Sequence, residues 1–100
     1  MKIKFSPQVN ERTLVYSFEE DVVKASLDGI EDIFDFSDMP DGKVGNPYED
    51  IESILDTQLI LSVEKINGEL RIELLNFIGF DATYEERFPE WFEVKFDGKN

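Results

Sequence analysis

The chain has 100 residues, of which 41% are hydrophobic, and its twenty-three acidic and ten basic side chains give a formal net charge of −13. It contains neither histidine nor cysteine, which excludes Ser-His-Asp and Cys-His relays, disulfides and thiolate metal sites. So acidic a chain also argues against binding to nucleic acid or to an anionic membrane, because both need a basic face.

The composition predicts one folded domain. Nine Phe, three Tyr and one Trp are too many for a disordered acidic segment, and 100 residues leave room for a single core. We place the domain at residues 1–97 and a C-terminal tail at 98–100. The first residues alternate in polarity instead of opening an apolar run, so we expect no secretory signal and a cytoplasmic location.

Apolar and polar residues alternate over 3–5, 14–18 and 23–27, which is typical of strands with one buried face. Asp28-Gly29 then suits the positive φ angles of a type I′ hairpin turn. Such a turn sets the pairs Leu27–Ile30, Ala25–Asp32 and Val23–Phe34. The apolar side chains of both strands, Ile30 included, should face inward together with Phe36. Asp32 shares that face, at a cost in free energy unless it finds a partner or lies at the rim.

The segment 38–48 is rich in glycine and proline and predicts a loop. After it, Asn46 can serve as the N-cap of a short helix with Pro47 at its first position. Tyr48, Ile51 and Leu55 would line one face of that helix. An extended conformation over 47–56 is the alternative.

Asn67-Gly68 predicts a second hairpin between two alternating segments. One face would hold the pairs Ile66–Glu69, Glu64–Arg71 and Ser62–Glu73. The other would hold the pairs Lys65–Leu70, Val63–Ile72 and Leu61–Leu74. Turn chemistry and hydrophobic pattern agree here, which makes this the strongest local prediction.

The C-terminal part predicts a short helix and a last strand. Thr83 and Glu86 form a capping-box pattern for one or two helical turns that end before Pro89. Phe92, Val94 and Phe96 then alternate as a strand that faces the core. Trp91 would face outward, either as a cover over the end of the sheet or as an interface anchor.

No motif predicts a catalytic, metal or cofactor site. Asp32, Asp35, Asp38 and Asp41 recur at every third position, but a calcium loop needs ligands at positions one, three and five. Pairs of carboxylates could act as acid and base in a hydrolase, yet with this many acidic residues such pairs arise by chance.

Two groups of residues are candidates for an interface. The first contains the large apolar side chains Trp91, Phe88 and Pro89, because aromatic anchors dominate protein interfaces. The second is the acidic cluster Glu19, Glu20 and Asp21, which could imitate DNA phosphates toward a basic groove. A solvated surface that keeps a small β protein soluble is the plainer interpretation of the cluster.

The segments 34–42 (FDFSDMPDG) and 74–83 (LLNFIGFDAT), followed by Phe88-Pro89-Glu90-Trp91, carry a resemblance. The chain resembles a group of short, acidic, uncharacterised proteins encoded by phages and prophages of Gram-positive Firmicutes, from about Tyr16 to Trp91. The resemblance implies a phage origin and a small accessory or virion-associated role, and it transfers no catalytic residue. That group looks extended after the central loop, where this chain is compatible with a helix.

We therefore expect a mainly β fold at the border of α+β: an antiparallel meander or partly closed barrel of five to seven strands with one or two short helices. The expected function is non-enzymatic, as a phage- or prophage-encoded protein-interaction or virion-assembly accessory protein in the bacterial host cell or on the virion. The expected partner is a protein, basic if electrostatics steers it, and homo-oligomers are compatible with the sequence. An acidic, DNA-mimic-like inhibitor of a host nucleic-acid-binding protein and a carboxylate-based hydrolase are the alternatives.

Overall fold

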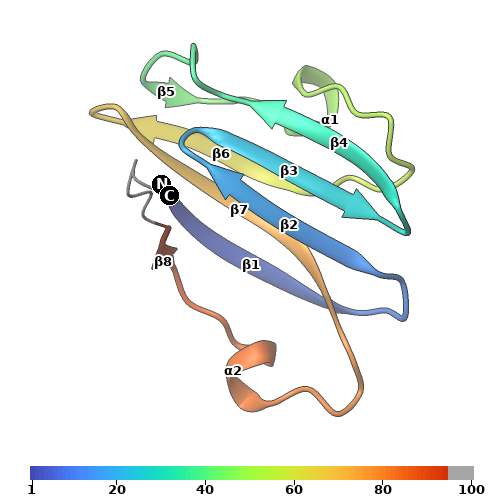
Figure 1. Cartoon of the computed structure of the whole chain (residues 1–100). Helices are drawn as coiled ribbons and strands as arrows, with labels where there is room; N and C mark the ends of the chain where they lie inside the picture. The colour runs from blue at the N-terminus through green and yellow to red at the C-terminus, as the bar shows by residue number, and fades with distance from the viewer. Residues whose placement is uncertain (95–100) are drawn as a thin grey trace.

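The computed structural model describes residues 1–94, which form two β-sheets laid over one another and two one-turn helices (Figure 1). The elements in chain order are β1 (Lys2–Val9), β2 (Leu14–Glu19), β3 (Val22–Leu27), β4 (Ile30–Asp35), β5 (Gly42–Lys43), α1 (Pro47–Asp50), β6 (Ile60–Ile66), β7 (Glu69–Ile78), α2 (Tyr84–Arg87) and β8 (Phe92–Glu93). The five-stranded sheet has the order β5-β6-β7-β1-β8 and the three-stranded sheet the order β2-β3-β4.

The prediction of a mainly β fold with two short helices is confirmed, and the sheets do not close into a barrel. One pairing has no counterpart in the sequence prediction. Strand β1 runs parallel to β7, with Ile3 opposite Ile72 and Phe5 opposite Leu74. Parallel strands need a long crossover, and here the whole three-stranded sheet lies between them along the chain (Figure 1).

Both predicted hairpin turns are confirmed. The φ angles of Asp28, Gly29, Asn67 and Gly68 are 51°, 85°, 50° and 80°, as a type I′ turn requires. The pairs between β3 and β4 agree with the prediction, and so do those between β6 and β7 up to the pair of Ser62 with Glu73.

Two inward positions were predicted wrongly. Ile30 is 56% exposed although its partner Leu27 is buried, because it lies directly after the turn on the edge strand β4 whereas Leu27 lies on the central strand β3. Leu61 does not lie opposite Leu74, since a β-bulge between Ile60 and Ser62 brings Ile60 to that position instead. The bulge adds one unpaired residue to the strand and shifts the register beyond it.

The core lies between the two sheets and is built from aliphatic and phenylalanine side chains. The buried hydrophobic residues are Ile3, Val23, Ala25, Leu27, Phe34, Phe36, Leu59, Ile60, Val63, Leu70, Ile72, Leu74 and Ile78. Lys65 is the buried exception, with 6% of its surface exposed. Its Nζ lies 3.0 Å from the carbonyl oxygen of Phe36 and 3.3 Å from Oδ2 of Asp21. The lysine therefore joins β6 to the three-stranded sheet through two polar contacts, which offset the desolvation of its charge.

Aromatic rings fill the side of the molecule where β2 faces β1 and β8. The ring of Tyr16 lies 6.1 Å from that of Phe18 and 5.9 Å from that of Phe5, and the ring of Phe92 follows at 5.5 Å from Phe5. The hydroxyl of Tyr16 donates a hydrogen bond to the carbonyl oxygen of Leu75, and burial raises the pKa of this phenol. These contacts connect the edge strand β2 to the five-stranded sheet.

Both helices have the predicted N-caps. The Asn46 side chain accepts a hydrogen bond from the N–H of Tyr48, and Thr83 and Glu86 form the full capping box. However, α1 ends at Asp50, so the predicted apolar face up to Leu55 does not lie on one helix. With four residues each, the helices of the described chain are too short to cross a bilayer. Val94 packs against the core, whereas Phe96 and the predicted tail at 98–100 lie outside the described residues.

Candidate functional site

Residues 79–91, which we call the connector, join β7 to β8 and project away from both sheets (Figure 1). The register explains why the connector leaves the sheet. Ile3 lies opposite Phe92, so a longer β8 would place Glu90 opposite Phe5, on the side that faces the core. One step further it would place Pro89, which has no N–H to donate, in the ladder. The strand therefore begins only at Phe92.

Internal hydrogen bonds hold the connector in one shape. The N–H of Ala82 donates to the carbonyl oxygen of Gly79 at 3.2 Å, which forms a turn before the capping box. The Arg87 guanidinium then reaches back, with Nε 3.2 Å from the carbonyl oxygen of Ala82 and Nη2 bonded to that of Phe80. The connector is thus a folded protrusion whose only basic side chain is engaged within it.

Three aromatic side chains of the connector are largely exposed: Phe80 at 82%, Tyr84 at 74% and Phe88 at 62%. The rings of Tyr84 and Phe88 lie 4.9 Å apart, as expected for positions separated by one helical turn. None of the four residues of α2 is buried. These rings therefore add little to the core, and they present apolar surface to the surroundings.

Trp91 faces outward, as predicted, but one side of its ring is covered. The guanidinium carbon of Arg71 lies 4.8 Å from the ring centroid, and the side chain remains 39% exposed. This contact favours the covering role of Trp91 over that of a free anchor. Phe88 is exposed and Pro89 is half-buried. Sequence reasoning missed Phe80 and Tyr84. Phe80 continues the alternation of the buried positions Leu74 and Ile78, so the pattern carries no signal of its exposure.

The acidic candidates lie on a different element from the aromatic ones. Glu19 ends β2, and Glu20 and Asp21 form the turn to β3, in which Glu20 adopts a φ of 51°. Asp21 is the carboxylate that pairs with Lys65, so it supports the core. Glu19 and Glu20 are exposed.

The negative charge is concentrated in one part of the chain. Residues 19–56, which we call the acidic region, hold thirteen acidic and two basic side chains. They include β3, β4, β5 and α1. The rest of the chain is close to neutral by comparison, so an approaching cation meets the strongest attraction at the acidic region.

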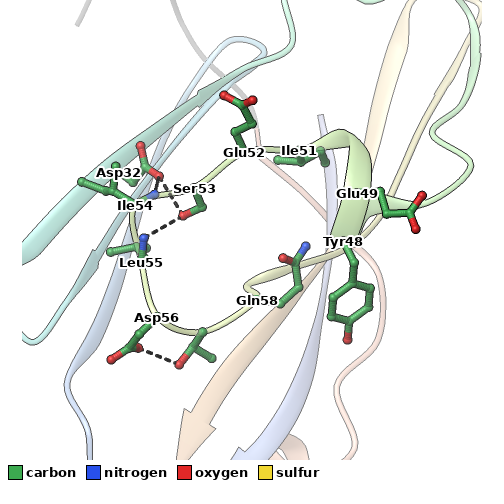
Figure 2. A pocket seen from close by; sticks show the side chains of 11 residues that line it. Asp32, Tyr48, Glu49, Ile51, Glu52, Ser53, Ile54, Leu55, Asp56 and Gln58 are labelled. Atoms are coloured by element: carbon green, nitrogen blue, oxygen red, sulfur yellow. Dashed lines mark hydrogen bonds between the residues drawn. The ribbon is translucent and has the colours of Figure 1, made fainter.

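An open hollow of about 730 Å³ lies within the acidic region, between α1 and the start of β6 (Figure 2). The residues that line it are Asp32, Tyr48, Glu49, Ile51, Glu52, Ser53, Ile54, Leu55, Asp56, Thr57 and Gln58. Asp32, the inward carboxylate of the first hairpin, accepts hydrogen bonds from the Ser53 hydroxyl at 2.8 Å and the Ile54 N–H at 3.0 Å. These bonds satisfy the carboxylate and fasten the loop to β4.

Two of the carboxylates around the hollow, Asp32 and Asp56, are poor candidates for a general acid. Burial acts to raise the pKa of Asp32, yet its hydrogen bonds with Ser53, Ile54 and Ile33 outweigh burial and lower the pKa. Hydrogen bonds from Arg12 and Thr57 lower the pKa of Asp56. A glycosidase-type acid needs a raised pKa instead. Within residues 1–94, no three acidic side chains are grouped closely enough to hold a metal ion.

Comparison with known proteins found no family model that matches this chain, and no match among curated proteins or solved structures.

Proposed function

We propose that this chain is a non-enzymatic protein-interaction component and that the connector is the part that contacts its partner. The observation that carries the proposal is the exposure of Phe80, Tyr84 and Phe88 on a protrusion with a fixed shape. Single exposed hydrophobic residues are common on protein surfaces. Here three exposed rings lie within nine consecutive residues and two of them, Tyr84 and Phe88, contact one another. Such a concentration of exposed apolar side chains is the feature that marks interaction sites.

The internal bonding of the connector supports this role. A flexible loop loses conformational freedom when it binds, which lowers its affinity. Here the capping box and the Arg87 guanidinium already fix the backbone around the exposed rings. Trp91 on Arg71 fixes the end of the connector against the five-stranded sheet. The rings are therefore presented at little further cost in entropy.

The resemblance to short acidic phage and prophage proteins suggests the biological setting of this interaction. We propose a virion-assembly or accessory role in the cytoplasm of a Gram-positive host cell or on the virion.

The test compares two variants for the proteins they capture from a lysate of such a host. The connector variant, Phe80→Ser/Phe88→Ser, removes two of the exposed rings. The control variant, Val15→Thr/Ile33→Thr, removes exposed apolar groups from the outer face of the three-stranded sheet, where the two side chains are 58% and 52% exposed. We expect proteins that the parent and the control capture and that the connector variant loses. Equal capture by all three chains would contradict the role of the connector.

The acidic region favours a second candidate function, inhibition of a host nucleic-acid-binding protein by imitation of DNA charge. Thirteen carboxylates against two basic side chains over residues 19–56 give the required charge density. Salt separates the two candidates. Binding through the acidic region should weaken steeply between about 50 and 200 mM salt, whereas a contact through aromatic rings should persist.

A further inference from the structure

We propose that the connector binds an apolar pocket that is ringed by lysine or arginine on a basic partner protein. The inference rests on the proposed function and adds the chemistry of the partner. It follows from the charges around the exposed rings and from the concentration of carboxylates in the acidic region.

The rim of the connector is acidic. Asp81, Glu85, Glu86 and Glu90 surround the exposed rings in sequence, and all four are exposed. The one basic residue of the connector, Arg87, donates to the carbonyl oxygens of Phe80 and Ala82. Two of its donors are therefore engaged on the backbone of the connector while the residue itself stays exposed, and a partner meets aromatic surface bordered by four carboxylates and this single cation. The complementary surface is apolar at its centre and basic at its edge.

A second copy of this chain is a poor occupant. Two chains with a net charge of −13 each repel one another, and the acidic rim would be repelled most strongly by the acidic region of the other copy. The outer face of the five-stranded sheet is mixed in sign, because Lys2 lies opposite both Arg71 and Glu93 across neighbouring strands.

The acidic region and the connector then contribute to different steps of binding. The acidic region acts over a distance of about 10 Å, the screening length at 0.1 M salt, and raises the rate of encounter with a basic protein. The connector makes the short-range contact that determines how long the complex lasts.

The test uses synthetic peptides and the emission of Trp91, which is the single tryptophan of the chain and ends the connector. One amphipathic peptide contains lysine and leucine, a second replaces leucine by serine at equal charge, and a third replaces lysine by glutamate. We expect saturable binding of the lysine–leucine peptide with a change in Trp91 emission, roughly tenfold weaker binding of the lysine–serine peptide, and no binding of the glutamate peptide.

The variants localise the contact. The connector variant should bind the lysine–leucine peptide roughly tenfold more weakly, and the control variant should change the Kd less than about twofold. Glu85→Gln/Glu90→Gln on the rim should weaken binding mainly through faster dissociation. Glu19→Gln/Glu20→Gln in the acidic region should slow association instead.

The proposal would be overturned if the connector and control variants lost the same amount of affinity for the lysine–leucine peptide. It would also be overturned if the parent bound the lysine–serine peptide as tightly as the lysine–leucine peptide. Either result would mean that basic peptides are attracted to any part of an acidic protein. No binding of the lysine–leucine peptide, together with connector-dependent capture from the lysate, would overturn the basic pocket and leave the interaction function standing. If the parent neither binds the lysine–leucine peptide nor captures any protein through the connector, both the basic pocket and the interaction function are overturned.

Discussion

The chain has two long connections that each begin with an N-capped helix of one turn, and they end up in different places. After α1, the segment up to residue 59 folds back on the molecule, and Ile51 and Leu55 pack against the core. After β7, the connector projects from the sheets with α2 fully exposed. Both caps are formed, so the local signal makes the helix in both cases. Long-range contacts decide whether the following segment packs, because Leu55 after α1 contacts the core whereas Phe88 after α2 stays exposed.

The largest expected effect separates these two connections by stability. Ile51→Ala/Leu55→Ala should lower the free energy of unfolding by about 2–3 kcal/mol, somewhat less than fully buried sites would. Phe80→Ser/Phe88→Ser should change it by no more than about 0.5 kcal/mol per site, because exposed side chains lose little on truncation. Urea denaturation of both variants measures the difference. Similar losses in the two would show that the connector also packs.

The N-caps sharpen the comparison. Asn46→Ala and Thr83→Ala each remove one capping bond and should each cost about 1 kcal/mol locally. Only the Asn46 variant should lower the global melting temperature, since α1 is tied to a packed segment. The Thr83 variant should show faster amide exchange in α2 with an unchanged melting temperature. A global loss for Thr83→Ala would show that α2 unfolds together with the core.

Trp91 is the point where the connector is fastened to the five-stranded sheet. Trp91→Ala removes its contact with the Arg71 guanidinium, which is worth about 0.5–1 kcal/mol at an exposed site. We expect a folded protein with a slightly lower melting temperature and increased amide exchange at residues 84–88. Trp91→Phe keeps a ring over the cation and serves as the control. Unfolding of Trp91→Ala would mean that Trp91 belongs to the core and would remove it from the interface.

The smallest expected effect is a pH dependence of the stability that Arg12 provides to the segment after α1. Arg12 bonds to Asp28 at 2.7 Å and Asp56 at 2.9 Å, and these bonds lower the pKa of both carboxyls below their ordinary value of 3.8. A lowered pKa in the folded state contributes stability above pH 3.8, which is lost as the pH falls through the folded value. Arg12→Gln should therefore be less stable than the parent at pH 6, and the two should converge near pH 2. A constant difference across this range would contradict the prediction.

Local chemistry made much of the fold predictable. The turns at Asp28-Gly29 and Asn67-Gly68 fix their hairpins because the turn and the alternating pattern specify the same register. Long-range contacts were beyond such reasoning. The residues next to Lys65 in sequence do not indicate that its ammonium group will contact Asp21 and the carbonyl oxygen of Phe36. The residues next to Leu61 likewise do not indicate the β-bulge between Ile60 and Ser62.

The candidate site was predictable only in part. The Phe88-Pro89 corner and Trp91 could be picked out by composition, because large apolar residues next to a helix end are conspicuous. Phe80 and Tyr84 could not, since their exposure depends on how the connector leaves the sheet. The connector leaves the sheet because of the register in which β8 pairs with β1, and this register depends on residues that are far apart in sequence.

The parallel pair of β1 and β7 also has a consequence for the order of folding. The three-stranded sheet and the β6–β7 hairpin contain only contacts between neighbours in sequence, so they can form as soon as their residues are available. Strand β1 must wait, because both of its partners, β7 and β8, lie toward the other end of the chain. During synthesis its apolar residues Ile3 and Phe5 therefore stay unpaired until the residues of β7 have left the ribosome. Strand β8 can join the sheet only after that, because it pairs with β1.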